Sequence, residues 1–247
     1  MLTEVIMATL IRRRLALASG CATLALPLVA AKAQETRLPL VETAGLNPLN
    51  VDVGTHVFQG RQCVRLRLSE GRQRVVMQQA VGNGATMALL PGEYGNATIR
   101  VDIAAEVNGR GAPDSRGFVG IAFRSAANGD RFEAIYLRMT NGTLADPPPG
   151  PPRNVRAIQY ISHPDFHFHV SRQASPDTYE KVAPVAIGRW FAFRIEVAGT
   201  TARAFIGDQK VLDVPDLRLG AAARGRIGLW VDDGTDGYFS NLSITPT

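Results

Sequence analysis

The sequence predicts an all-β fold in which two antiparallel sheets pack face to face as a sandwich. Short runs that alternate apolar and polar residues recur through most of the chain, and glycine or asparagine bounds many of them. Helical periodicity is scarce after residue 33. Because no helical segments separate the runs, the strands are expected to pair in antiparallel fashion, as they do in sandwiches and barrels.

Strands are expected where the alternation is clearest. These runs cover residues 62–68, 97–104, 118–124, 132–139, 156–161, 190–197, 202–206, 226–231 and 238–244. Successive side chains of a strand point to opposite faces, so Val119, Ile121 and Phe123 share an apolar face and Arg124 falls on the other. Trp230 likewise lies opposite the apolar face of its run. Each strand thus has one face for the core and a second face, with aromatic or arginine side chains, that suits a glycan.

The first 33 residues have the pattern of a cleaved export signal. Three consecutive arginines precede an uncharged apolar stretch, and Ala31-Lys32-Ala33 fits the small-x-small pattern that signal peptidase cleaves. The apolar stretch is short for a transmembrane helix and contains Pro27, although a membrane anchor is the alternative. Residues 1–33 are therefore predicted to be a signal peptide, and the mature protein is predicted to be exported to the periplasm or the cell exterior.

Composition limits what residues 34–247 do. Residues 1–33 carry four basic side chains and one acidic one, so removing their charge of +3 leaves about +2 of the whole-chain +5. So small a charge does not indicate a nucleic-acid-binding protein, and no membrane contact is expected after cleavage because no other apolar stretch is long enough. Cys63 has no cysteine partner in residues 34–247, so a packed core must stabilise the single domain predicted there.

Two stretches resemble the concanavalin A-like lectin/glucanase superfamily. "GFVGIAFRSAANGDRFEAIYLR" is similar to a strand pair of 3-keto-disaccharide hydrolase-like domains, and "GRIGLWVDDGTDGYFSNLSI" is similar to the closing hairpin of the wider fold group, which laminin G-like domains share. The resemblance implies a jelly-roll sandwich of two curved sheets with carbohydrate on the concave face. It also implies that Arg124 and Glu133 are polar groups of that face.

The chain departs from these families at several positions. Ile135 stands where the keto-sugar family has glutamine, and Phe118-Val119 replaces an asparagine-serine pair. The E-x-D-x-x-E strand of laminarinase-type glucanases, which sets two carboxylates about 5 Å apart, is absent from the sequence. A 3-keto-glycoside hydrolase, another hydrolase or lyase, and a protein that only binds carbohydrate all stay open.

If the protein is an enzyme, the candidate catalytic residues are Glu133, His163 and Asp165. A carboxylate or imidazole needs only one close neighbour to bring its pKa into a working range. Pro164 holds His163 and Asp165 near each other. The strand that ends at Ile161 leads to His163, and Glu133 is expected on a strand beside it. Glu133 would act as general acid or base. The alternative is a buried structural carboxylate paired with an arginine, because Ile135 shares its face.

Recognition of a saccharide requires aromatic rings for the sugar faces and planar hydrogen-bonding groups for the hydroxyls. The residues that we expect to bind substrate on this basis are Arg124, Tyr136, Arg138, Gln159, Tyr160, Trp190 and Trp230. Carbohydrate is the expected partner. The alternative from another class is a non-catalytic laminin G-like module that packs against a cell-envelope protein.

The histidines suggest a further alternative. Three of the four in the chain fall in "YISHPDFHFHV" with H-x-x-x-H-x-H spacing. If residues 166–170 are extended, His167 and His169 share a face at a spacing that suits zinc or copper, and His163 and Asp165 could supply further ligands. The protein would then be a metal-dependent enzyme.

The turn "VDDGTDGY" offers three carboxylates, Asp232, Asp233 and Asp236, to a structural calcium ion. A tight Asp-Gly hairpin also needs these residues for its backbone geometry, which is the competing explanation. No cofactor is expected apart from this calcium alternative.

Overall fold

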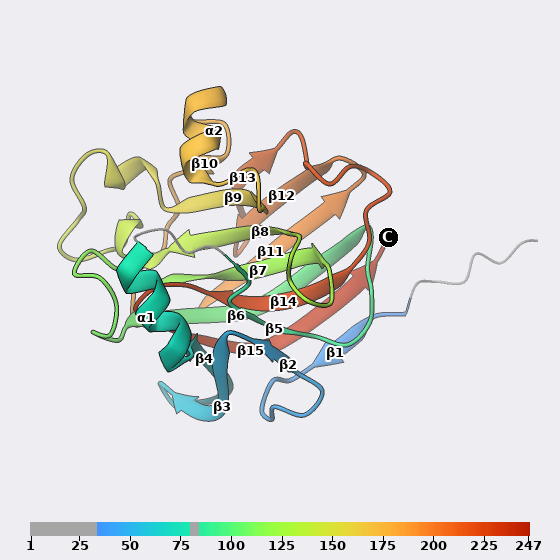
Figure 1. The fold of residues 1–247 in the computed structure, drawn as a ribbon, viewed down its shortest axis with the longest axis horizontal. Helices are drawn as coiled ribbons and strands as arrows, with labels where there is room; N and C mark the ends of the chain where they lie inside the picture. The colour runs from blue at the N-terminus through green and yellow to red at the C-terminus, as the bar shows by residue number, and fades with distance from the viewer. Residues whose placement is uncertain (1–33, 80–83) are drawn as a thin grey trace, which may run out of the picture. The chain divides into compact units, whose positions relative to one another are not determined.

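The computed structural model describes residues 34–79 and 84–247, which form two antiparallel β-sheets (Figure 1). Sheet A has the order β13 (Gln209–Val214), β12 (Thr201–Ile206), β11 (Phe191–Ala198), β6 (Ala97–Val107), β15 (Thr235–Pro246), β4 (Arg61–Leu68), β3 (Val51–Phe58), and β1 (Thr36–Leu38) also pairs with β15. Sheet B has the order β10 (Glu180–Lys181), β9 (Ile158–His163), β8 (Phe132–Arg138), β7 (Phe118–Ser125), β14 (Arg226–Val231), β5 (Met87–Leu89), β2 (Asn47–Leu49). The predicted all-β, antiparallel jelly-roll sandwich is confirmed. The predicted signal peptide lies outside the described residues.

The nine predicted runs all fall on strands, with ends shifted by a few residues. The alternation does not predict β1, β2, β3, β5, β10 and β13, which are short or lie at the edge of a sheet. It also does not predict two helices, α1 (Glu70–Gln79) and α2 (Phe168–Ala174), or the short 3-10 turns η1 (Met139–Asn141) and η2 (Arg153–Val155). No helix of residues 34–79 and 84–247 is both long and apolar enough to cross a membrane.

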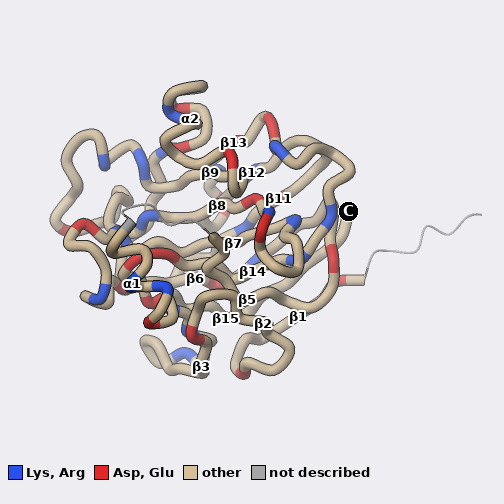
Figure 2. Tube along the Cα trace, viewed as in Figure 1, with Lys and Arg blue, Asp and Glu red and all other residues tan. Residues whose placement is uncertain are grey.

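An apolar core fills the space between the sheets. β7 contributes Val119, Ile121 and Phe123 to it, as the alternation predicts, and β14 contributes Ile227 and Leu229. All five side chains are at most 2% exposed. Acidic and basic residues are interspersed along the chain trace (Figure 2), so the charge at any one place depends on which side chains the fold brings together.

A second apolar cluster covers the outer face of sheet B, the face turned away from sheet A. It includes Met87, Phe132, Tyr136, Ile161 and Trp230, which alternate along their strands with residues that face the core. The central strands of sheet B are therefore buried on both faces. The helices α1 and α2 contribute side chains above this second cluster.

Gly120 explains how two large rings lie over the outer face of sheet B. Its cross-strand partners are Tyr136 on β8 and Trp230 on β14, one on each side. A Cβ atom at residue 120 would lie only 2.5 Å from the Cα atom of Tyr136, so any larger residue would push the strands apart. Glycine lets the two rings meet above it, with centroids 4.7 Å apart.

Candidate functional site

A cavity of about 580 Å³ lies on the outer face of sheet B. Strands β7, β8, β9 and β14 supply its floor, and α1, α2 and the segments 112–116 and 232–233 supply its walls. We call it the outer-face cavity. Its volume falls within the range of about 300–1,000 Å³ that is usual for small-molecule sites, so the cavity is a candidate ligand-binding site.

Aromatic rings form the floor and one edge of the outer-face cavity. Phe118, Tyr136 and Trp230 lie side by side on three neighbouring strands. Tyr136 and Trp230 are 5% and 4% exposed, so they sit deep. At the mouth, Phe168 of α2 and Met77 of α1 are 37% and 48% exposed. Rings at both depths can pack against the apolar faces of a sugar.

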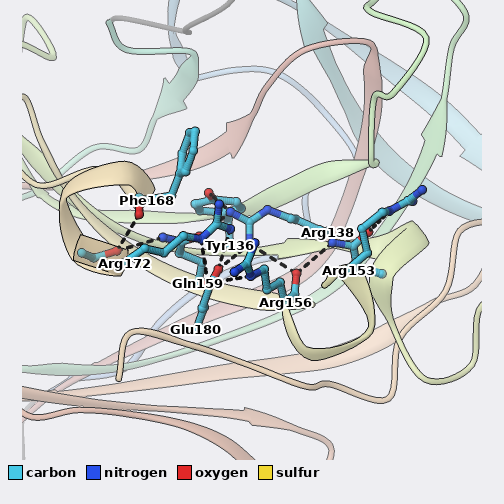
Figure 3. A network of polar contacts seen from close by, with 10 residues as sticks. Tyr136, Arg138, Arg153, Arg156, Gln159, Phe168, Arg172 and Glu180 are labelled. Carbon is cyan, nitrogen blue, oxygen red and sulfur yellow. Dashed lines mark hydrogen bonds and ion pairs between the residues drawn. The ribbon is translucent and has the colours of Figure 1, made fainter. Parts of the chain in front are cut away.

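One wall of the cavity is a network of charged and polar groups around Arg138, at the end of β8 (Figure 3). The Arg138 guanidinium donates hydrogen bonds to the Tyr136 hydroxyl, at 2.9 Å, to the Gln159 side-chain oxygen and to the Arg156 carbonyl oxygen, at 3.2 Å. It also lies 3.4 Å from the Glu180 carboxylate. The Arg138 and Glu180 side chains are only 3% and 4% exposed, so the network is held within the protein.

Glu180 connects this network to α2. Arg172 donates two hydrogen bonds of 2.7 Å to the two Glu180 oxygens, and the Arg156 guanidinium lies 3.1 Å from one of them. Burial by itself would raise the pKa of Glu180, but the hydrogen bonds from Arg172 and the charges of Arg138 and Arg156 outweigh it and hold that pKa below its usual value. Glu180 is therefore ionised at neutral pH and fixes the position of α2 over the cavity.

Across the cavity, Asp232 and Asp233 follow β14. Both Asp233 oxygens are occupied, since one accepts a hydrogen bond from the Gln73 amide and the other accepts from the Ala112 N–H and the Ser115 hydroxyl. Asp232 is different: its Oδ1 finds no hydrogen-bond partner among the described residues, and burial raises the pKa of its carboxyl group to about 6. The Trp230 indole N–H also lacks a partner in the described part of the chain. These two groups are available to a ligand that reaches them.

The predicted outer placement of Arg124 and Glu133 is wrong. Glu133 lies between the sheets, where its Oε1 accepts hydrogen bonds from the Tyr160 hydroxyl, at 2.7 Å, and from the Leu219 N–H, at 3.2 Å. Arg124 lies 3.4 Å from the other Glu133 oxygen, and both side chains are 0% exposed. The environment of Glu133 is that of a structural ion pair, the alternative that its shared face with Ile135 indicates.

Arg124 leaves the alternation because β7 has an irregularity beside it. The pairing with β14 shifts between Arg226 and Gly228, and Arg124 has a positive φ of 51°. A β-bulge of this kind re-aims a side chain. Tyr160 was also expected to bind substrate, but its side chain is fully buried in the core.

The other predicted binding residues divide between two faces. Tyr136, Arg138 and Trp230 line the outer-face cavity. Gln159 supports them from within the Arg138 network without lining the cavity itself. Trp190 packs with Phe58 in a separate cluster on sheet A and donates its indole hydrogen bond to the Phe58 carbonyl oxygen, so it is not part of the cavity.

The extended conformation that the metal alternative requires at residues 166–170 is absent, because α2 begins at Phe168 and His167 stands at its N-terminus. His163 stacks on Phe132, and its Nδ1 lies 3.1 Å from Nε2 of His167. Burial lowers the pKa of His163 and lowers that of His167 to about 4, so both imidazoles are neutral at pH 7. They form a hydrogen-bonded pair at the edge of the cavity, which His167 lines.

The remaining predicted residues lie elsewhere. His163 and Asp165 line a separate hollow of about 270 Å³, and His169 is exposed on α2. Asp236 accepts a hydrogen bond from Asn108 and lies 3.9 Å from Arg65. Within residues 34–79 and 84–247, no three His, Cys, Asp or Glu side chains come together as a metal ion requires, so the geometry does not support the zinc and calcium alternatives.

Several residues that line the cavity were not predicted from the sequence, among them Met77, Arg116, Phe168 and Arg172. Met77, Phe168 and Arg172 lie on α1 and α2, which the alternation of apolar and polar residues does not predict. The spacing of Phe168 and Arg172, four residues apart, is the one signal that would have found part of this set, because it puts both on one face of a helix.

Comparison with known proteins identifies the fold. No protein-family model matches the chain. A search of curated proteins also finds no match. Among solved structures, the chain is similar to the carbohydrate-binding module CBM66 from Bacillus subtilis, with a TM-score of 0.53 and 14% identity over 81% of this chain and 95% of that one. A protein of unknown function with a galectin-like fold from Bacillus subtilis gives 0.49 and 12%, over 85% and 94%.

The fold is a two-sheet antiparallel β-sandwich, as in that carbohydrate-binding module. At such low identity the likeness shows the architecture alone, and the finer resemblance to 3-keto-disaccharide hydrolase-like domains stays a prediction.

Proposed function

We propose that this protein binds a saccharide in the outer-face cavity of sheet B. The observation that carries the proposal is the lining of that cavity, where aromatic rings lie beside a guanidinium, an indole N–H and a carboxylate. Rings that cover the apolar faces of a sugar, beside groups that bond its hydroxyls, are what saccharide recognition requires. The carbohydrate-binding module with a similar fold is consistent with this function.

The two tryptophans allow a direct test of the location. Trp230 lines the cavity and Trp190 lies on sheet A, and residues 34–247 contain no other tryptophan. In Trp190→Phe, Trp230 is the only reporter, and its fluorescence is expected to change on titration with oligosaccharides. In Trp230→Phe, the remaining Trp190 signal is expected to stay constant. A response from Trp190 alone would place the ligand elsewhere and overturn the proposal.

Phe168 provides a matched pair of variants. The ring of Phe168 lies 4.9 Å below the Arg172 guanidinium at the mouth of the cavity, and the ring of Phe205 lies 3.8 Å below that of Arg194 on sheet A. Phe168→Ala is expected to weaken saccharide binding by about tenfold, from the loss of a stacking ring. Phe205→Ala removes an equivalent ring–guanidinium contact and is expected to leave binding unchanged. Calorimetric titration of both variants would decide; equal affinities would exclude Phe168 from the site.

A second candidate function is cleavage of the bound saccharide, and Asp232 favours it. A buried carboxyl group with a raised pKa can donate a proton to a leaving group near neutral pH. Incubation with a panel of oligosaccharides, followed by chromatography, would reveal products. Asp232→Asn is expected to abolish product formation while binding persists, because the amide retains an acceptor oxygen. Identical product profiles for the variant and the wild type would remove Asp232 from catalysis.

We also propose that the protein is exported, on the pattern of residues 1–33. Expression of the full chain in a bacterial host is expected to yield a periplasmic or secreted protein that begins at Gln34, which N-terminal mass analysis would detect. A chain that stays in the cytoplasm at full mass would contradict export without affecting the binding proposal.

A further inference from the structure

We infer that the saccharide bound in the outer-face cavity contains a uronic acid, whose carboxylate lies against Arg138 and Arg172. The inference rests on the proposed function, because it concerns the ligand of the same cavity. It follows from an imbalance of charge in one wall of the cavity and from the arrangement of that wall across sheet B.

A single carboxylate serves three guanidinium groups in this wall (Figure 3). Glu180 lies 3.4 Å from Arg138, 3.1 Å from Arg156 and 2.7 Å from Arg172. Among the described residues, none of these three arginines forms an ion pair with any other carboxylate. Three positive charges against one negative charge leave the cluster at +2.

Of the three arginines in the cluster, Arg138 is the one whose positive charge is least hydrated. Its side chain is 3% exposed, and apart from Glu180 its hydrogen bonds go to neutral oxygens of Tyr136, Gln159 and Arg156. Burial lowers the pKa of Arg138, because removal from water disfavours its charged form. A buried charge without a full counter-charge is costly, so an anion that reaches Arg138 would be bound favourably.

A ligand has access to this wall, because Arg138 and Arg172 both line the cavity. Arg116 lines it as well, and its ion pair with Asp114, at 3.3 Å, is weak because the Asp114 side chain is 75% exposed to water. A planar guanidinium can hold a carboxylate by two parallel hydrogen bonds. A neutral sugar could bond the same donors but would leave the excess charge in place.

The wall across the cavity suits hydroxyl groups. On β7, Phe118 pairs with Arg138 on one side, and on the other side its carbonyl oxygen accepts a hydrogen bond from the Asp232 N–H. Arg138 and Asp232 are therefore separated by two strand spacings, or about 10 Å. The free oxygen of Asp232 would accept a hydrogen bond from a sugar hydroxyl and repel a second anion. The site thus favours a saccharide with its carboxylate toward β8 and its hydroxyls toward β14.

The test uses Trp190→Phe, so that Trp230 fluorescence reports on the cavity. The ligands are oligosaccharides of galacturonate, of glucuronate, and of mannuronate and guluronate, each compared with its carboxyl-reduced neutral form. At least one uronate is expected to bind ten times more tightly than its reduced form or better, and to weaken as salt concentration rises. A sulfated neutral oligosaccharide forms a third arm, and tighter binding of the sulfate ester than of every uronate would overturn the assignment to a carboxylate.

Variants of two arginines, one in the cavity wall and one on sheet A, complete the test. Arg172→Gln, in the same background, is expected to reduce the uronate preference to less than threefold. Arg203→Gln is the control, because Arg203 lies on sheet A and also pairs with a glutamate. Thermal unfolding would verify that both variants fold. Uronates that bind no better than their neutral forms, or an unchanged preference in Arg172→Gln, would overturn the inference and leave the proposed function standing. The absence of any Trp230 response across the panel would overturn both.

Discussion

Sheet B carries a buried arginine–glutamate pair on each of its faces. Arg124 and Glu133 approach to 3.4 Å on the inner face, and Arg138 and Glu180 approach to the same distance on the outer face. The inner pair is balanced, one charge against one. In the outer pair, the carboxylate is shared with two further guanidinium groups, and Arg138 lines a cavity.

The inner pair ties loops to the sandwich. Arg124 donates hydrogen bonds to the carbonyl oxygens of Gly199 and Gly220, at 2.7 and 3.0 Å, and Glu133 accepts the N–H of Leu219. All these partners belong to connections between strands. The comparison shows that a buried ion pair does not by itself indicate a binding site; the balance of its charges and its access to a cavity distinguish the two roles.

The largest expected effect is the loss of stability when the carboxylate of the inner pair is removed. Glu133→Gln should lower the free energy of unfolding by about 3–5 kcal/mol, because it leaves the fully buried Arg124 without its counter-charge. Urea unfolding of residues 34–247 would measure it. The exposed Glu93→Gln is the control, with an expected change within about 0.5 kcal/mol. A loss below about 1 kcal/mol would mean that the inner pair is not structural.

Removal of the outer carboxylate should cost less. Glu180→Gln is expected to lower the free energy of unfolding by about 1–3 kcal/mol, because the Arg156 and Arg172 side chains are 27% and 25% exposed and stay partly hydrated. Since the folded protein holds the pKa of Glu180 below the ordinary value of 4.5, this stabilisation is fully present above pH 4.5 and is lost as the pH falls below it. The stability curves of wild type and Glu180→Gln should therefore converge in acid. Curves that stay parallel down to pH 3 would contradict this account.

Asp232 should show the smallest effect, with the opposite sign. Burial raises the pKa of its carboxyl group from 3.8 to about 6, so the folded state favours the protonated form and loses stability as the pH rises through this interval. The full shift would correspond to about 3 kcal/mol, but the Asp232 side chain is only partly buried and therefore partly screened by water. Asp232→Asn is expected to be more stable than the wild type at pH 7, by on the order of 1–2 kcal/mol, and equally stable below pH 3.8. Thermal unfolding at several pH values would measure it, and a variant less stable than the wild type at pH 7 would refute it.

The strand alternation predicted much of the fold and part of the site. It placed Val119, Ile121 and Phe123 in the core and Trp230 on the outer face. It failed for Arg124, because a β-bulge reverses the direction of a side chain without leaving a mark in the apolar pattern.

The histidine segment shows a different kind of failure. His167 and His169 suggest a strand when every second residue is considered, but the segment forms the start of α2. A short helix of this kind is stabilised by its tertiary contacts, here those of Arg172 with Glu180, and not by intrinsic preference. The histidine spacing therefore did not indicate the wall that α2 adds to the cavity, and only the four-residue spacing of Phe168 and Arg172 pointed to it.

The sandwich and the inward face of most strands could be predicted from the residues alone, because a period of two residues is a local property of a strand. Which charges are compensated depends instead on contacts between distant parts of the chain. Glu180 lies 42 residues from Arg138, and Gln159 lies 21 residues from it, so their meeting depends on how β8, β9 and β10 align side by side. Electrostatic energy depends on distance and burial in space, and neither can be read along the chain.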